Sequence, residues 1–509
     1  MTRVYSNRLS EYSHENGGRV LLLFLLFLVA LYELVTIGFS AFAIVCSLPF
    51  LVLFLYCVFR WKMMAFWLLI TINYFLAMKN ISLPFPASLP NELLEVLLIA
   101  VAIIDSRQTP HFDRAGNIML LALIIWTGLC FLEVFNDTCN LGINVAAWYV
   151  GFRLFAQQLI FVLLVFSLYI STPQNLMMYL KMWALFCLFS AFWTWKQEYM
   201  GFTDAEKLWI ETRGRSTHIL NAGTLIRYFS TFDNAASYGC HAAAAAVAFI
   251  IIGITNRINK ARYFFLLISI FVIWGMFQSG TRTAIYCLAA GLIVYIFLSK
   301  SVKIAVPFSI IVAIMGFLLV FTTIGNSNQQ IRRMRSAFNK DDASANVRDI
   351  NKEAIRKYIK DAPWGIGLGM GSDKVPANNK YKKLSSIPPD SEYVYIWVHT
   401  GPIGVSIFTI CMILIFAGGC HVVLFRLKNK SLIGIGAGLC SAFVAINLGG
   451  YANQVLYGFP NGITFFGGMA IVYILPYLEP EWNKYEERLL AEQEEKKRLK
   501  LEKKLASRV

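Results

Sequence analysis

The sequence has little charge for its length. Of 509 residues, only 15% are Asp, Glu, Lys or Arg, whereas 57% are hydrophobic, and the mean hydropathy is +0.57. A soluble protein of this size could not bury so much apolar surface. The composition therefore excludes a soluble globular fold and indicates a protein that spans a membrane.

Histidine is also scarce, and neither histidine nor cysteine is clustered. The six histidines are scattered without an H-x-x-x-H pattern, and the paired acids lack the spaced partners of a magnesium site. We therefore expect no metal site and no cofactor. Nine of the ten cysteines fall in or at the ends of apolar runs, and only Cys139 lies in a connecting loop. We predict no structural disulfide.

Long apolar runs are abundant instead. A helix needs about 17 to 25 residues to cross roughly 30 Å of hydrocarbon, and such runs predict an all-α polytopic membrane protein with about 12–14 transmembrane helices. The weakest run is short and carries Glu92 and Glu95 at its start. The predicted spans are residues 20–37, 41–59, 63–80, 92–104, 117–135, 155–171, 176–195, 236–255, 262–279, 283–299, 304–324, 402–424, 431–449 and 462–478.

The Lys and Arg residues of short loops predict the orientation, because such loops are basic on the cytoplasmic side. With the N-terminus inside, the basic loops fall inside as well, at residues 60–62, 105–114, 256–262, 299–303 and 425–430. The opposing short loops, which begin at Ile81 and Gly450, contain no Lys or Arg. We expect both termini to be cytoplasmic.

Two segments, Lys196 to Ala235 and Gly325 to Asp390, are too long and polar to be turns. Four predicted spans separate them, so both are expected on the outer face. The C-terminal tail, residues 479–509, is charged and has Leu at helical spacings. This pattern predicts a helix that lies near anionic lipid headgroups or pairs with another helix. The predicted parts are N-terminal transmembrane helices (1–195), a first outer loop (196–235), central transmembrane helices (236–324), a second, basic outer loop (325–391), C-terminal transmembrane helices (392–478) and a cytoplasmic tail (479–509).

The second outer segment, residues 325–390, is basic, with thirteen Lys or Arg against seven acids. Ordinary solvation of a surface domain explains such a surplus, and so does an anionic ligand at the outer leaflet. Both explanations remain open at this point.

Two arginine motifs flank the predicted central spans. "FQSGTRTA" places Arg282 in the turn between two spans, where Gly280 permits a tight reversal, and "TLIRYFSTFDNAASYG" places Arg227 and Asp233 just before a span. The simpler explanations are a snorkelling arginine at a helix end and a loop that supplies a turn or helix cap. Against the first, short outer loops are generally poor in arginine.

A third motif, "SANVRDINKEAIRKYIKDAPWGIGLGMG", predicts an amphipathic helix opened by Arg348 and ending in a glycine-rich turn. Gly365, Gly367 and Gly369 of this turn are candidates for a backbone nest that binds an anion. A plain loop is the commoner origin of such glycines.

Two carboxylates precede an apolar run in "PPDSEYVYIWVHTGPIG". A carboxylate at the membrane boundary can accept a proton, and burial raises its pKa toward a useful value. Asp390 is the stronger candidate for a base and Glu392 its alternate, unless Asp390 caps the following helix after Pro389. His399 fits a packed interfacial histidine better than a base.

The order of these motifs resembles the O-antigen ligase and Wzy-type O-antigen (polysaccharide) polymerase superfamily. The resemblance covers roughly residues 220–410 in motifs. In the ligases the last motif is similar to His-[Asn/Ser/Gln]-x9-Gly-x-x-Gly, whereas here Asp390 takes the histidine's place ahead of Ser391, Gly401 and Gly404. That departure favours a polymerase over a ligase.

The resemblance implies a glycosyltransferase in the bacterial cytoplasmic (inner) membrane, with its active site on the outer face. The implied donor is a glycan on polyprenyl pyrophosphate and the acceptor a second glycan, with membrane lipids and a chain-length regulator or other polysaccharide-assembly proteins as partners and no nucleic acid. The predicted pyrophosphate-binding residues are Arg227, Arg282 and Arg348, since guanidinium binds phosphate oxygens bidentately. The predicted catalytic residues are Asp390, Glu392 and Arg282, and the predicted substrate-binding residues are Asp233, Gly365, Gly367 and Gly369.

Two alternatives stay open. A ligase or protein O-oligosaccharyltransferase of the same superfamily uses similar chemistry with another acceptor. A lipid-linked oligosaccharide flippase is expected to carry ionisable residues at mid-membrane depth, where this sequence has few, such as Glu33 and Lys181.

Overall fold

A computed structural model describes most of the chain, and its regular structure is almost entirely helical. Within that part, only β1 (Ile219–Leu220) and β2 (Leu225–Ile226) are strands, and they pair antiparallel. The predicted all-α polytopic fold is confirmed. The described residues are 17–36, 39–79, 88–105, 112–220, 225–300, 306–307, 309–310, 313–314, 316–317, 321–324, 327, 329–335, 343–387 and 391–506.

The chain divides into two compact units, Met1–Trp67 and Leu68–Val509. The described helices of the first unit are the apolar α2 (Gly17–Thr36) and α3 (Phe39–Arg60). Helix α4 (Lys62–Phe75) begins in the first unit and continues into the second. The motifs with candidate site residues all belong to the second unit.

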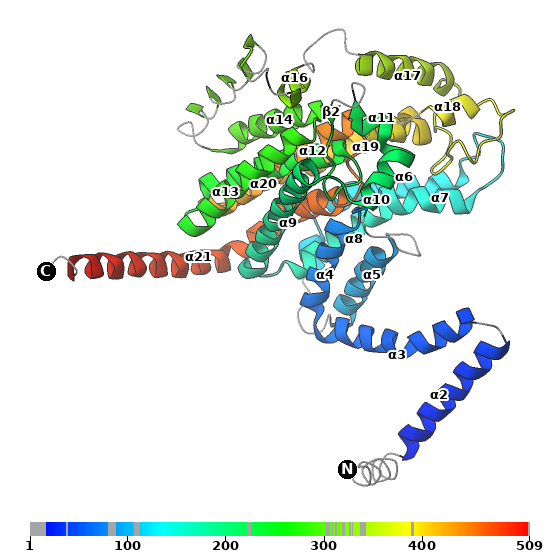
Figure 1. The fold of residues 1–509 in the computed structure, drawn as a ribbon, viewed down its shortest axis with the longest axis horizontal. Coiled ribbons are helices and arrows are strands. Elements are labelled where there is room, and N and C mark those ends of the chain that lie inside the picture. The colour runs from blue at the N-terminus through cyan, green and yellow to red at the C-terminus, as the bar shows by residue number, and fades with distance from the viewer. Residues whose placement is uncertain are drawn as a thin grey trace. The chain divides into compact units, whose positions relative to one another are not determined.

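The second unit contains the remaining elements, labelled in Figure 1 where there is room. They are α5 (Leu89–Ile104), η2 (Phe112–Ala115), α6 (Ile118–Leu132), η3 (Glu133–Phe135), α7 (Val145–Phe152), η4 (Arg153–Gln157), α8 (Gln158–Tyr169), α9 (Pro173–Tyr199), α10 (Asp204–Trp209), η5 (Ile210–Gly214), α11 (Arg215–His218), α12 (Ala235–Thr255), α13 (Asn259–Gln278), α14 (Arg282–Leu298), α16 (Gln329–Arg335), α17 (Ala343–Ile359), α18 (Lys382–Ser386), α19 (Glu392–His421), η8 (Val422–Arg426), α20 (Lys430–Ala452) and α21 (Asn461–Ala506).

Among the described residues, nine helices are long and apolar enough to cross a membrane, or ten if the bent pair Pro49–Arg60 and Lys62–Phe75 forms one span. Every predicted span overlaps one of these helices except residues 304–324, where the described residues form only separate stretches of two to four. The span predicted at 155–171 is longer, because Val145–Tyr169 is continuous. Arg153 lies inside it and forms an ion pair with Glu92 of α5 at 3.4 Å.

Helix α12 lies at the centre of the second unit, against α13, α14 and α20. Its run of five alanines, Ala242 to Ala246, is fully or almost fully buried. Small residues let helix backbones approach closely in a membrane. The partner helices use the same device, since a Cβ on Gly438 of α20 would lie 3.2 Å from the Ala248 carbonyl oxygen.

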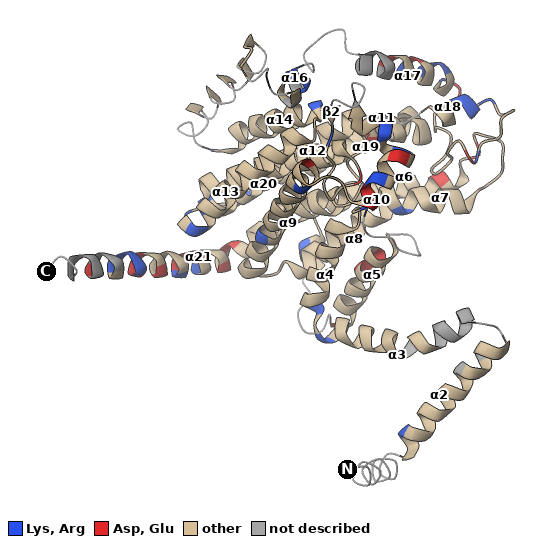
Figure 2. Ribbon diagram, viewed as in Figure 1, with Lys and Arg blue, Asp and Glu red and all other residues tan. Residues whose placement is uncertain are grey.

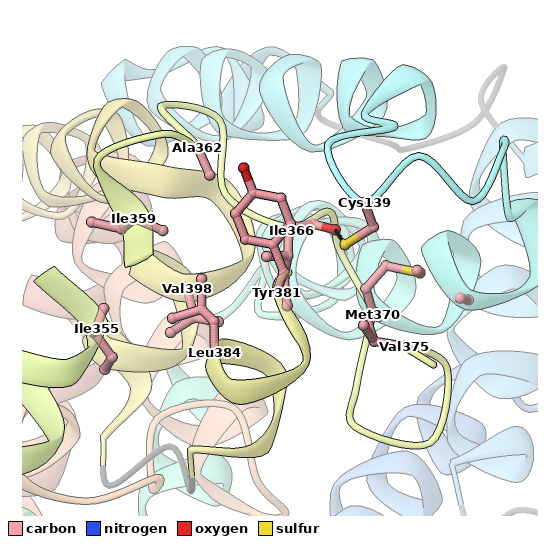
Figure 3. Packing of buried hydrophobic residues seen from close by; sticks show 11 residues of the cluster. Cys139, Ile355, Ile359, Ala362, Ile366, Met370, Val375, Tyr381, Leu384 and Val398 are labelled. Atoms are coloured by element: carbon pink, nitrogen blue, oxygen red, sulfur yellow. Dashed lines mark hydrogen bonds between the residues drawn. The ribbon is translucent and has the colours of Figure 1, made fainter. Parts of the chain in front are cut away.

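The second long polar segment folds around its own small core, shown in Figure 3. Ile355 and Ile359 of α17 pack with Leu384 of α18 and Val398 of α19. The loop that follows α6 joins this core, because Asn379 donates a hydrogen bond to the Cys139 carbonyl at 2.7 Å. The described part of this basic segment is therefore attached to the spanning helices by buried apolar contacts.

Candidate functional site

The turn between α13 and α14 is the point where the two long polar segments meet. Gly280 adopts φ of 56° in this turn, a left-handed conformation that glycine reaches without steric cost. The Ser279 carbonyl accepts from Arg227 Nε at 3.3 Å, and the Gly280 carbonyl accepts from Arg333 Nε at 2.7 Å. One turn thus aligns an arginine from each segment beside Arg282, the first residue of α14.

Arg227 is held in place along its whole length. Its backbone N–H donates to the His218 carbonyl at 2.9 Å beside the β1–β2 pair. Its Nη1 donates to the Thr217 carbonyl and its Nη2 to Thr281 Oγ1, both at 3.0 Å. None of the acceptors of its guanidinium carries a charge, so the protein orients this cation without neutralising it.

Three arginines, Arg227, Arg282 and Arg333, crowd together around this turn; we call them the arginine cluster. Burial first, and then the positive charges of Arg333 and Arg282, lowers the pKa of Arg227 to about 10. Burial and the charge of Arg282 lower the pKa of Arg333 to about 10 as well. Arg227 and Arg333 therefore remain cations near neutral pH. Figure 2 shows the basic residues of α16 beside α14.

The arginine cluster has the chemistry of a phosphate site. Crowding like charges in a partly buried place is unfavourable, and an anion that bridges the guanidinium groups relieves it. Such perturbed groups gather at functional sites more often than elsewhere. Of the two explanations for the basic segment, residues 325–390, the anionic ligand therefore agrees better with this geometry than plain solvation does.

Glu392 lies at the same end of the bundle, at the start of α19. It is 5% exposed, and its Oε2 accepts from the Leu456 N–H at 3.1 Å in the loop between α20 and α21. Three residues earlier in that loop, Asn453 donates to Thr283 Oγ1, next to Arg282, at 3.1 Å. A single short loop therefore connects Glu392 with the arginine cluster.

Asp390 lies outside the described residues. The N-cap of α19 is nevertheless visible and is Ser391, whose Oγ accepts from the Val394 N–H at 3.0 Å. The alternative that Asp390 caps this helix is wrong, because the neighbouring serine satisfies that N–H. Asp390 itself stays a sequence-based prediction.

The glycine-rich turn packs against the kink of α19. The N–H of Gly367 donates to the His399 carbonyl at 3.0 Å, and that of Gly365 donates to Ala362 at 2.9 Å. A Cβ on Gly369 would lie 1.9 Å from the Ala147 carbonyl oxygen. Close packing thus explains Gly365 and Gly369, and a φ of 95° explains Gly367. The amides of Gly365 and Gly367 are engaged within the protein.

His399 is buried and its Nδ1–H donates to the Gly367 carbonyl at 2.8 Å, while its ring packs on Tyr395 with centroids 4.0 Å apart. This agrees with the expectation of a packed histidine. The side chain of Arg348 lies outside the described part, although its backbone belongs to α17. Arg348 therefore stays a sequence-based prediction.

Asp233 forms an ion pair with Lys79 at 3.0 Å, and Asn234 rather than Asp233 caps α12. Nearby, His218 is 2% exposed and both ring nitrogens are engaged. Its Nδ1–H donates to the Gly214 carbonyl at 3.0 Å, and its Nε2 accepts from the Ala235 N–H at 3.1 Å. Burial, with the charges of Arg227 and Lys79, lowers the pKa of His218 to about 4.

Sequence reasoning missed Arg333 and His218 as parts of this region. Arg333 is one of thirteen basic residues in its segment, and no local motif separates it from its neighbours Arg332 and Arg335. His218 carries no motif either. The one available signal was the placement of both long segments on the same face.

Fold and site together define a polytopic membrane protein with a cationic site where its helices turn. Residues 267–409 match a family model described as O-antigen ligase, and members of that family are glycosyltransferase-like membrane enzymes. The matched range contains Arg282, Arg333 and the glycine-rich turn. It supports the O-antigen ligase and Wzy-type superfamily, as the order of motifs indicated. No curated protein matches the chain.

Proposed function

We propose that this chain polymerises oligosaccharide repeat units carried on polyprenyl pyrophosphate, at the outer face of the cytoplasmic membrane. The observation that supports this most is the arginine cluster, in which two long segments and a helix turn converge. A lipid-linked pyrophosphate brings at least two negative charges to the membrane surface, and three guanidinium groups match it in charge and in bidentate geometry.

The proposed reaction transfers one glycan chain to another. The bond between the anomeric carbon and the pyrophosphate oxygen breaks, and polyprenyl pyrophosphate leaves with the electron pair. Negative charge grows on that leaving group as the bond stretches. Cations that are already oriented stabilise the transition state more than the ground state, and Arg227 is oriented by contacts along its whole length.

The acceptor hydroxyl forms the new bond to the anomeric carbon and releases its proton. We assign that proton to the carboxylate of Asp390. The N-cap of α19 is the neighbouring Ser391. Glu392 is buried and bonded to the Leu456 amide, so we assign it a positioning role. It would hold the start of α19 against the loop that contacts Thr283 beside the arginine cluster.

A ligase or protein O-oligosaccharyltransferase is the second candidate, and the description of the matching family favours it. The acceptor distinguishes the two. The purified protein in liposomes, given only polyprenyl-pyrophosphate-linked repeat units, should produce a ladder of lengthening glycans. A product that forms only after lipid A core or acceptor protein is added would replace the polymerase by a ligase. Movement of the lipid-linked unit across the bilayer without joining would replace both by a flippase.

The proposal also requires the arginine cluster to face outward. Reporter tags at Val509 and beside Lys428 should indicate the cytoplasm, and a tag at Ala377 should indicate the outside. Ala377 is exposed, so an insertion there leaves the buried core of its segment intact. A cytoplasmic signal from Ala377 would contradict the outer-face assignment.

A further inference from the structure

A second cationic site lies at the end of the bundle opposite the arginine cluster. Helix α6 begins there, α19 ends there and α21 passes beside them. These three helices enclose a cleft of about 370 Å³. Its lining includes Arg114, Asn117, His421, Arg426, Tyr473 and Tyr477.

The walls of this cleft are fixed by close helix contacts. A Cβ on Gly418 of α19 would lie 2.1 Å from Cγ2 of Ile118 and 2.3 Å from the Tyr473 hydroxyl. That hydroxyl donates to the Ile415 carbonyl at 2.7 Å. Asn117 is engaged as the N-cap of α6, where its Oδ1 accepts from Met119 at 2.9 Å. The cleft is therefore a built feature of the helix packing.

Arg114 gives the cleft its chemistry. Its guanidinium lies 5.8 Å from the centre of the Tyr477 ring. Its Nη1 is buried and has no hydrogen-bond partner among the described residues. The acids Asp113 and Glu481 lie near enough to act on its charge, yet burial still lowers the pKa of Arg114 below its usual value. A buried guanidinium donor without an acceptor is costly unless a ligand supplies one.

We propose that this cleft binds the phosphate headgroup of an anionic phospholipid from the adjacent leaflet. The cleft lies between the ends of membrane-spanning helices, where lipid headgroups are the most abundant anions. Two arginines offer donors to the phosphate oxygens, and the tyrosines provide the mixed apolar and polar wall found at membrane interfaces. The inference concerns a lipid site and is independent of the proposed polymerase function.

The test uses the full-length protein in phosphatidylcholine nanodiscs with and without a photo-cross-linkable phosphatidylglycerol. Cross-links should map to peptides that contain residues 114–118 and 418–426. The double variant R114Q/R426Q should lower the cross-linked fraction there by roughly tenfold, since each basic residue near a bilayer contributes to anionic lipid binding. Photo-cross-linkable phosphatidylcholine should not label these peptides above background.

The matched control is K428Q/K484Q, which removes two exposed cations outside the cleft and should keep the labelling. R426Q alone guards against misfolding, because the Arg426 side chain is exposed, and it should already lower the labelling. Equal labelling in the cleft variants and the control would overturn the proposal. Full competition by millimolar inorganic phosphate would also overturn it, because the ligand would then be a soluble anion.

Discussion

Two charged regions of the second unit differ in the partners of their ionised side chains. In the arginine cluster, like charges crowd around one turn, and the guanidinium of Arg227 is oriented by uncharged acceptors. In α21, Glu486 is buried, forms an ion pair with Arg257 at 3.7 Å and accepts from Asn429 at 2.8 Å. Glu479, seven residues earlier on the same face of α21, accepts from the Lys428 N–H at 2.8 Å.

We interpret the difference as one between charges that stabilise the fold and charges arranged for an anionic ligand, as proposed above. The glutamates of α21 hold the loops before α13 and α20 with hydrogen bonds and an ion pair, so they need nothing further. Crowded, partly buried arginines are unfavourable in the free protein, and this cost is offset when an anion binds. The alternating charges along the rest of α21, visible in Figure 2, agree with a solvated helix.

The sharpest way to break this comparison is to remove cations from the arginine cluster. R227A and R282A should each reduce polymer formation by about a hundredfold to a thousandfold, the usual effect of deleting a preorganised group that stabilises developing charge. Lysine should restore little activity because it binds phosphate as a point charge. Glycan ladder length on a gel, beside protein level on a blot, measures the effect.

Neighbouring arginines of α16 provide the matched control. R333A should lower polymer formation strongly, whereas R332A should not, because Arg332 is exposed and Arg333 contacts the α13–α14 turn. Equal activity of the two variants would remove Arg333 from the site. Full activity in R282A would leave Arg282 as a snorkelling arginine and would sink the proposed pyrophosphate site.

An effect of comparable size should come from Asp390. D390N keeps the shape of the side chain but loses the proton acceptor, so polymer should fall by about 10²- to 10⁴-fold while single lipid-linked units accumulate. The variant D390H should recover partial activity. The acidic limb of its pH–activity profile should move toward the usual pKa of imidazole, about 6.5.

S391A separates this role from capping. It removes the observed N-cap of α19 and should cost about 1 kcal/mol of stability, with ladders of normal length. Long ladders in D390N would exclude Asp390 as the base and would make Glu392 the next residue to test. Loss of ladders in S391A at normal protein level would contradict the purely structural assignment of Ser391.

The sequence predicts most of the fold because lipid imposes a simple rule. Every backbone polar group in hydrocarbon must be bonded, so long apolar runs become helices, and all predicted spans in the described part are helical. The sequence predicted a span that begins at residue 155, whereas the helical span begins at Val145 and includes Arg153. Its partner Glu92 is distant in sequence, and no local pattern shows that pair.

The site was predictable only in part. Arg227 and Arg282 were identified because each lies beside a predicted span, where a cation requires an explanation. Arg333 lies in a long basic segment without a motif of its own, and its contact with Gly280 joins residues 53 positions apart, so only the tertiary structure shows it. For the glycine-rich turn, the spacing of the glycines suggested a backbone nest for an anion. In the structure this turn packs against α19.

A smaller, structural effect should follow from changes in that turn. G369A would place a Cβ 1.9 Å from the Ala147 carbonyl oxygen at a φ of 74°. A left-handed non-glycine residue alone costs about 1–3 kcal/mol. The amount of folded protein should therefore drop, whereas G458A, with nothing within 4 Å of its Cβ, should leave it unchanged. Normal folding of G369A with loss of activity would instead favour a ligand at the turn.

The smallest effect should be a pH dependence of stability at His218, beside the arginine cluster. Its folded-state pKa is about 4, below the unfolded value of about 6.5. The unfolded chain therefore binds a proton more readily than the folded protein between these pH values. The contribution of neutral His218 to the free energy of unfolding is therefore fully present above pH 6.5. It is lost as the pH drops toward 4, by about 1.4 kcal/mol per pH unit.

H218Q keeps one donor and one acceptor but does not titrate. The melting temperature of purified protein in detergent, measured from pH 7.5 to 5, should decline less steeply in H218Q than in the wild type. Parallel declines would mean that the pKa of His218 is not lowered in the folded protein, and that its hydrogen bond from Ala235 is not the arrangement in solution.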